Sequence, residues 1–325
     1  MTRGARALLA DLVDYAGLFP PAGLAMAEAT EQYAAHLGEP AAWMLGRFVV
    51  PAARLDELER VADPLWAALG AAGKAPSPGP GPGSGAPDGG PDSTSAALGP
   101  APWRLSALVG PALEAHAEAV SDFNVRHTGR ARVETVELTA HSAVEAEAAL
   151  AVLPPGLLTY VEVPLAGDPD PILGVLKRRR ARAKVRTGGV AAEAIPGPAP
   201  LARFLEACAR VRVAFKATAG LHHPVRAEHP LTYERGAPRA TMHGFLNVFT
   251  AAGLARAGLD ATALEAVLRE TDPSAFRLDD SGLAWRDRRL DPASLAALRR
   301  DFAASFGSCS FAEPVAELRA LGAIA

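Results

Sequence analysis

The sequence predicts an α/β protein built as one (β/α)8 barrel across residues 1–325. Short apolar, β-rich runs alternate with amphipathic stretches rich in alanine, leucine and glutamate. Strands separated by helices of this length form right-handed βαβ units and a parallel sheet. No Gly-x-Gly-x-x-Gly sequence follows the first run, which disfavours an open dinucleotide-binding sheet. With 325 residues, 49% of them hydrophobic, the chain is long enough for a barrel with additional segments.

The predicted strands are seven apolar runs and an eighth near the C-terminus. They cover residues 12–18, 44–50, 104–109, 132–138, 158–163, 183–186, 213–216 and 302–307. Helices are expected between most of them, at residues 25–37, 53–69, 113–125, 143–153, 171–180 and 200–210. In such a barrel the functional side chains are expected at the C-terminal ends of the strands.

Two segments depart from this alternation. Residues 70–102 contain nine glycines and eight prolines and no aromatic residue, a composition that predicts a disordered surface loop. Residues 221–300 are predicted to form an insertion between strands seven and eight. Helices are expected there at 244–257 and 261–270, with a β-hairpin across 276–285, and a further helix at 292–303 leads to the eighth strand.

Composition excludes several classes of partner. The net charge is −3, with 33 basic and 36 acidic residues interspersed, which predicts binding to neither nucleic acid nor an anionic membrane. The two cysteines, Cys208 and Cys309, are far apart in sequence, so a disulfide framework is not expected and a reducing compartment fits. Because no signal-peptide pattern or 18-residue apolar run occurs, we expect a soluble cytoplasmic protein. The sequence leaves homo-oligomerisation open.

Lys184 and Lys216 are the most informative residues, because they occupy consecutive predicted strands near the C-terminal ends. Desolvation and a like-charged neighbour both favour the neutral amine, which is a nucleophile able to form a Schiff base with a carbonyl compound. The alternative is that each lysine extends its ammonium into solvent or pairs with a carboxylate.

A turn near the C-terminus predicts an anion site. Residues Gly307-Ser308-Cys309-Ser310 precede a predicted helix, with Ser310 and Glu313 forming a capping box. Free backbone N–H groups and the helix dipole favour a phosphate there, assisted by Gly188 and Gly189 and by Arg186 or Arg226. An ordinary capped helix is the alternative.

Four short motifs in barrel order resemble the deoxyribose-phosphate aldolase group of class I aldolase barrels. They are Asp14-Tyr15-Ala16-Gly17-Leu18, Lys184-Val185-Arg186-Thr187-Gly188, Lys216-Ala217-Thr218-Ala219-Gly220 and Phe306-Gly307-Ser308-Cys309-Ser310. The resemblance extends over most of the chain and implies a Schiff-base aldolase that needs no cofactor.

The resemblance also implies roles for individual residues. Lys184 would form the imine, and repulsion from Lys216 would favour its neutral form. The strand-four aspartate of the family falls near Glu134, with Glu137 as the competing assignment because side chains three apart point to opposite faces of a strand. Glu162 would hold a lysine or transfer protons. Asp14 completes the catalytic set, and the substrate or its phosphate would contact Arg186, Thr187, Gly188, Gly189, Thr218, Gly220, Gly307, Ser308 and Ser310.

Two departures from the family pattern affect the expected function. Arg186 stands where the family has a small residue, which indicates a further anionic group on the substrate or a changed reaction. The insertion at 221–300 also has no counterpart in the family pattern. We therefore predict an aldolase-like lyase acting on a small, phosphorylated or otherwise anionic carbonyl compound.

Two other function classes remain open from the sequence. A metal-dependent hydrolase or lyase would use His222, His223 and His243. A non-catalytic barrel would bind a metabolite at an ancestral site.

Overall fold

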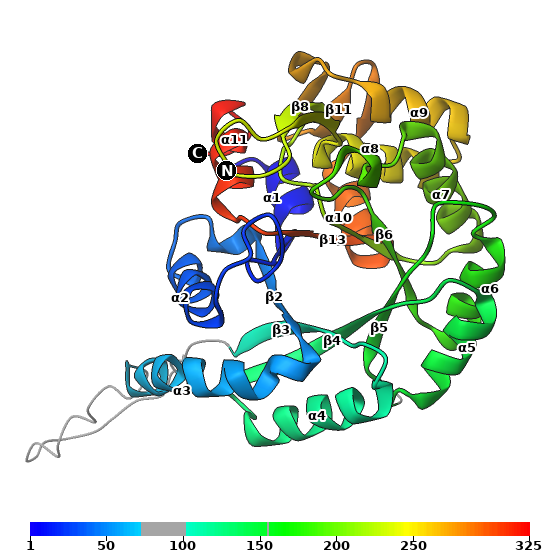
Figure 1. The fold of residues 1–325 in the computed structure, drawn as a ribbon. Coiled ribbons are helices and arrows are strands. Elements are labelled where there is room, and N and C mark those ends of the chain that lie inside the picture. Colours follow the sequence, from blue (N-terminus) through cyan, green and yellow to red (C-terminus); the bar gives the residue numbers. More distant parts are fainter. Residues whose placement is uncertain (73–101, 155) are drawn as a thin grey trace, which may run out of the picture.

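Eight parallel strands close into a barrel, with helices packed around it, in the computed structural model of the chain (Figure 1). The structure describes residues 1–72, 102–154 and 156–325. The strands are β1 (Val13–Tyr15), β2 (Leu45–Pro51), β3 (Trp103–Leu108), β4 (Ala131–Thr139), β5 (Leu158–Glu162), β6 (Arg182–Arg186), β7 (Phe215–Thr218) and β13 (Ala303–Ser308). Their sequential order, closed by pairing of β13 with β1, confirms the predicted barrel.

The helices follow the strands in the predicted alternation. They are α1 (Arg3–Leu9), α2 (Met26–Leu37), α3 (Leu55–Ala72), α4 (Leu113–Arg126), α5 (Ala143–Val152), α6 (Asp170–Arg179), α7 (Pro198–Val211), α8 (Phe245–Arg256), α9 (Ala261–Arg269), α10 (Pro292–Asp301) and α11 (Ala312–Ala320). Most of the predicted disordered loop, residues 73–101, lies outside the described residues. No helix among the described residues is long and apolar enough to cross a membrane.

Strand alternation separates a polar interior from an apolar outer face. In β3, Trp103 faces outward, where its ring meets that of Trp66 of α3 at 5.8 Å. Arg104 and Ser106 face inward instead, because they contact carboxylates carried by β4. Successive strand side chains point to opposite faces, so one strand supplies both the packing surface for the helices and polar groups for the interior.

A bulge in β4 changes which residues reach the interior. Leu105 pairs with Val133, but the next residue, Ser106, pairs with Thr135, so Glu134 is an extra residue in this strand. An extra residue in one strand interrupts the alternation of faces. Glu134 and Glu137 are therefore both directed to the barrel interior, whereas uninterrupted alternation predicted opposite faces.

The chain between β7 and β13 forms several further elements. β8 (Ala227–Pro230) pairs with β9 (Arg239–Met242), and β10 (Phe276–Asp279), β11 (Gly282–Trp285) and β12 (Arg288–Leu290) form an antiparallel sheet. Helix α8 is buried along nearly its whole length. Phe245 of α8 stacks on Phe306 of β13 at 5.0 Å between ring centroids, which joins this segment to the barrel wall.

Candidate active site

The two lysines lie side by side inside the barrel. Lys184 of β6 and Lys216 of β7 are paired in the strand register. Their side chains are 5% and 1% exposed, respectively. Both line a cavity of about 320 Å³ together with Glu137 of β4, Arg186 of β6 and Gly307 of β13.

Lys216 is held by two carboxylates. Its Nζ donates to Asp14 Oδ2 and to Glu137 Oε1, each at 2.6 Å, and lies 5.6 Å from the centre of the Tyr160 ring. Burial lowers the pKa of Lys216, but the two carboxylates outweigh burial and raise this pKa above its ordinary value. Lys216 is therefore a stable ammonium group.

Lys184 contacts a different pair of carboxylate oxygens. Its Nζ lies 3.3 Å from Glu137 Oε2 and 3.0 Å from Glu162 Oε2. The second oxygen of Glu162 accepts a hydrogen bond from Arg186 Nε at 3.1 Å. Lys184 thus has two bases in contact with its amine, and one of them, Glu162, lies at the C-terminal end of its strand.

Glu137 is the residue that joins the two lysines, because each of its oxygens contacts one amine. The Ser106 hydroxyl donates to Glu137 Oε1 at 2.7 Å, and the Thr135 hydroxyl donates to Ser106 at 2.7 Å. Burial raises the pKa of Glu137, but the Lys216 and Lys184 charges oppose burial and bring this pKa to about 2. The negative charge of Glu137 offsets the repulsion between the lysines.

Asp14 is positioned by groups from both neighbouring strands. Its Oδ1 accepts from the Arg47 backbone N–H at 2.8 Å, and its Oδ2 accepts from the Ser305 hydroxyl at 2.7 Å. Burial raises the pKa of Asp14, but Lys216 and Arg47 hold it below its usual value. Asp14 is therefore a carboxylate fixed beside Lys216. The supporting residues Ser106 and Ser305 were not predicted from the sequence.

Glu134 lies in a different group of charges. Its carboxylate is 2.9 Å from an Arg47 guanidinium nitrogen and 3.2 Å from Arg104 Nε. Arg104 also contacts Asp11 at 2.8 Å. Of the two glutamates considered from the sequence, Glu137 is the one beside the lysines.

The residues predicted to bind an anion separate into two groups. Gly189, Thr218 and Gly307 line the cavity together with Arg186. Thr187 and Gly188 instead join two loops, since the Thr187 hydroxyl donates to the Thr218 and Ala219 carbonyls at 3.1 and 2.6 Å.

Gly188 and Gly220 approach each other closely. A Cβ on Gly188 would be 3.0 Å from the Gly220 Cα, and Gly220 has a φ of +70°. A side chain would crowd the facing loop at Gly188 and would strain the backbone at Gly220, which accounts for glycine at both positions.

The turn after β13 has its hydroxyls engaged. Ser308 Oγ donates to the Ser310 carbonyl at 2.6 Å, and Ser310 Oγ accepts from the Glu313 N–H at 3.2 Å. The Glu313 carboxylate lies 3.3 Å from His222 and accepts from the Tyr233 hydroxyl at 3.1 Å. The Ser310 hydroxyl therefore caps the helix as predicted. The Glu313 carboxylate contacts His222 and Tyr233 instead of the Ser310 backbone N–H.

The three histidines considered as metal ligands have separate partners. His222 contacts Glu313, whereas His223 lies 2.6 Å from Glu317. His243 Nε2 lies 2.8 Å from the Pro196 carbonyl, and burial lowers the pKa of His243 to about 4. Among the described residues, no group of three or more His, Cys, Asp or Glu side chains is arranged to hold a metal ion.

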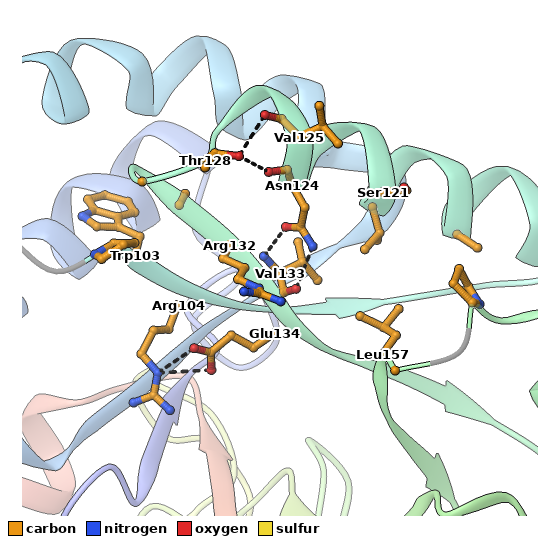
Figure 2. A pocket seen from close by; sticks show the side chains of 17 residues that line it. Trp103, Arg104, Ser121, Asn124, Val125, Thr128, Arg132, Val133, Glu134 and Leu157 are labelled. Carbon is orange, nitrogen blue, oxygen red and sulfur yellow. Dashed lines mark hydrogen bonds and ion pairs between the residues drawn. The ribbon is translucent and has the colours of Figure 1, made fainter.

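A larger cavity of about 790 Å³ lies outside the barrel, between α4 and the strands β3 and β4 (Figure 2). Asn124 hydrogen-bonds to the backbone of Val133 across it, and Arg104 pairs with Glu134 at its edge. None of its described lining residues is a lysine, histidine or cysteine. The larger of the two cavities is therefore not the one with amine, imidazole or thiol side chains. Those side chains line the barrel cavity.

Lysine is rare in this chain, which makes the buried pair notable. Of 33 basic residues, 29 are arginine and four are lysine, and two of those four are Lys184 and Lys216. A guanidinium stays charged in proteins, whereas an amine can lose its proton and act as a nucleophile. This bias was readable in the sequence and strengthens the case for chemistry at the pair. Comparisons with known protein families, curated proteins and solved structures found no match for the chain.

Proposed function

We propose that the chain is a Schiff-base-forming, aldolase-like carbon–carbon lyase that acts on a small anionic carbonyl compound. The observation that carries the proposal is a pair of buried lysines that share Glu137 and line a cavity large enough for a small metabolite. Two amines beside fixed carboxylates supply a nucleophile, a base and a permanent cation in one place.

Lys184 is the proposed nucleophile because it is the more exposed amine and contacts Glu162 at the strand end. Glu162 takes a proton from the ammonium, and Nζ attacks the carbonyl carbon of the substrate. The oxygen of the resulting carbinolamine then leaves as water after gaining a proton, which forms the iminium. The Lys216 ammonium stabilises negative charge that develops on the oxygen in the first step.

Cleavage follows from the electron demand of the iminium. A base removes the proton of a hydroxyl on the carbon β to the imine carbon. As that hydroxyl becomes an aldehyde, the bond between the α and β carbons breaks. Its electron pair moves to the imine nitrogen to give an enamine. Glu137 and Asp14 are the carboxylates that accompany Lys216 in this region and are suited to such proton transfer.

The anionic part of the substrate is proposed to contact Arg186. Its side chain is about half exposed, lines the cavity and is tied to Glu162 through one nitrogen. The remaining guanidinium donors are suited to a carboxylate or phosphate. Gly307 adds a wall without a side chain at the cavity, which leaves room for a bulky anionic group.

Borohydride trapping tests the proposal with acetaldehyde, pyruvate and glyceraldehyde 3-phosphate as carbonyl probes. Only an imine is reduced to a stable secondary amine. We expect covalent adduct formation in the wild type and its loss in Lys184→Met, because the thioether cannot attack a carbonyl. Lys177→Met is the matched control, since Lys177 lies on the outer helix α6.

Arg186→Gln tests the proposed selectivity. It should reduce trapping of pyruvate and glyceraldehyde 3-phosphate more than trapping of acetaldehyde, because only the first two carry an anion. Equal trapping in the wild type and Lys184→Met would rule out Lys184 as the nucleophile. Equal losses of trapping for all three probes in Arg186→Gln would contradict the proposed anion contact and would leave the role of Lys184 unaffected.

A further inference from the structure

A second cluster of titratable side chains lies beside the same cavity. Cys309 follows β13, His222 follows β7, Tyr233 lies between β8 and β9, and Glu313 belongs to α11. Cys309 and His222 both line the cavity that contains the two lysines. Both are at least nine-tenths buried. Two segments distant in sequence, the turn after β13 and the chain after β7, therefore bring a thiol and an imidazole together at a cavity surface.

The contacts define which atoms carry protons. Ser308 Oγ donates its hydrogen to the Ser310 carbonyl at 2.6 Å, so toward His222 Nδ1, 3.0 Å away, it acts as an acceptor. His222 Nδ1 therefore carries a proton. The Glu313 carboxylate, 3.3 Å from the same nitrogen, favours the doubly protonated ring.

Cys309 lies against this imidazole ring. Its Sγ is 3.9 Å from each ring nitrogen of His222 and 3.5 Å from the Tyr233 hydroxyl. Burial raises the pKa of the Cys309 thiol, but His222 and Tyr233 outweigh burial and bring this pKa below its ordinary value. Burial lowers the pKa of His222, but Cys309 and Glu313 outweigh it and raise this pKa to about 9.

Two further groups, the Tyr15 phenol and the Ala22 backbone, lie close to the Cys309 sulfur. The Tyr15 phenol of β1 is close enough for Cys309 to contribute to the raised pKa of that phenol, and the Ala22 backbone favours the thiolate. Across the cavity stand the cationic groups Lys184, Lys216 and Arg186. The Glu137 carboxylate lines the same cavity and pairs with both lysines, so charges of both signs face this cavity.

We propose that Cys309 and His222 form a thiolate–imidazolium pair, which makes Cys309 a second nucleophile in the cavity, reactive toward small soft electrophiles. The inference does not depend on the lyase proposal, since neither lysine takes part. With iodoacetamide as the probe, Sγ attacks the methylene carbon. A carbon–sulfur bond forms, the carbon–iodine bond breaks and iodide leaves, so no oxidant or further reactant is required.

The chain contains its own control for this chemistry, because it has two cysteines. Cys208 lies on α7, has no exposed surface, and has a thiol pKa raised well above the ordinary value by burial. It is expected to resist alkylation while the protein is folded. Cys208→Ser is the matched variant, which should leave the Cys309 rate unchanged.

The experiment is alkylation of the full-length protein with iodoacetamide over a range of pH, with each cysteine followed by peptide mass spectrometry. The Cys309 rate should rise with pH through a midpoint below the value of about 8.5 found for a free thiol. His222→Gln removes the imidazolium, so the midpoint of Cys309 alkylation should move upward and its rate at pH 7 should fall. Cys208 should react only after denaturation in urea.

Three results would overturn the proposal of a thiolate–imidazolium pair. One is a Cys309 that stays unmodified in the folded protein but reacts in urea, and another is a midpoint at or above that of a free thiol. The third is an identical midpoint in the wild type and His222→Gln. If His222→Gln does not fold, the wild-type midpoint and the contrast with Cys208 decide the question.

Discussion

Two ionic networks occupy the interior of the same barrel, and they differ in the kind of cation they contain. The cavity network comprises Asp14, Glu137, Glu162, Lys184 and Lys216. The base network comprises Asp11, Arg47, Arg104 and Glu134. The cavity network holds amines, which can release protons, whereas the base network holds guanidinium groups, which cannot.

The networks also differ in burial. Asp14, Glu137 and the two lysines of the cavity network have side chains that are 1–5% exposed. Those of the base network are 16–58% exposed, and they come from β2, β3, β4 and the residues before β1, nearer the N-terminal ends of the strands. In (β/α)8 barrels the C-terminal ends of the strands carry chemistry and the N-terminal ends contribute stability. Ion pairs are present in both networks, so buried amines beside a cavity are what distinguish the candidate site from the base network.

The largest expected difference concerns the two glutamates of β4. Glu137→Gln leaves two buried lysines with fewer counter-charges, so it should lower the free energy of unfolding by about 3–5 kcal/mol. Glu134→Gln is the matched change in the base network. It should lower this free energy by about 0–1 kcal/mol, because its arginine partners are partly solvated and keep other carboxylates. Urea unfolding of both variants provides the measurement. Equal losses in the free energy of unfolding would contradict the difference between the two networks.

Acid should affect the cavity network through Glu137. Its pKa falls from the ordinary 4.5 to about 2 in the folded protein, so the unfolded chain takes up this proton first as pH falls. The stabilisation is complete above about pH 4.5 and is lost as pH falls from 4.5 toward 2. The stability of Glu137→Gln should therefore depend less on pH in this window. Parallel curves for the wild type and the variant would assign the acid sensitivity to other groups.

A smaller effect is expected from anions at the cavity. Sulfate should raise the melting temperature of the wild type more than chloride at matched ionic strength, because binding to the folded state stabilises it. Gly307→Val should reduce this difference, since the added side chain would enter the cavity from β13. Equal sulfate effects in the wild type and the variant would place the anion elsewhere, with the base network as the first alternative.

Much of the barrel was predictable from the sequence because its local patterns agree with the closed sheet. The apolar runs and intervening helices matched the observed elements to within a few residues, apart from β1, which is shorter than the predicted 12–18. The side-by-side register of Lys184 and Lys216 also follows from two neighbouring strands with similar flanking sequences. The periodic spacing of apolar residues in the sequence indicates these strands and helices directly.

The competition between Glu134 and Glu137 could not be decided from the sequence. The answer depends on the bulge at Glu134 of β4, opposite Leu105 and Ser106 of β3, which no residue pattern in β4 indicates. The cluster around Cys309 was missed for a different reason. Its members come from two stretches of chain far apart in sequence, 222–233 and 309–313, and the Glu313 carboxylate turns toward His222 rather than completing a capping box. Long-range contacts of this kind leave no local signature.

The most direct test of the central claim is the location of the trapped adduct within the chain. After reduction by borohydride in the presence of glyceraldehyde 3-phosphate, peptide mass spectrometry should find the secondary amine on Lys184, with little on the outer Lys177. With four lysines in the sequence, the assignment is unambiguous. An adduct distributed equally over Lys177 and Lys184, or a folded wild type that forms none with any probe, would contradict the proposal that the cavity network performs imine chemistry.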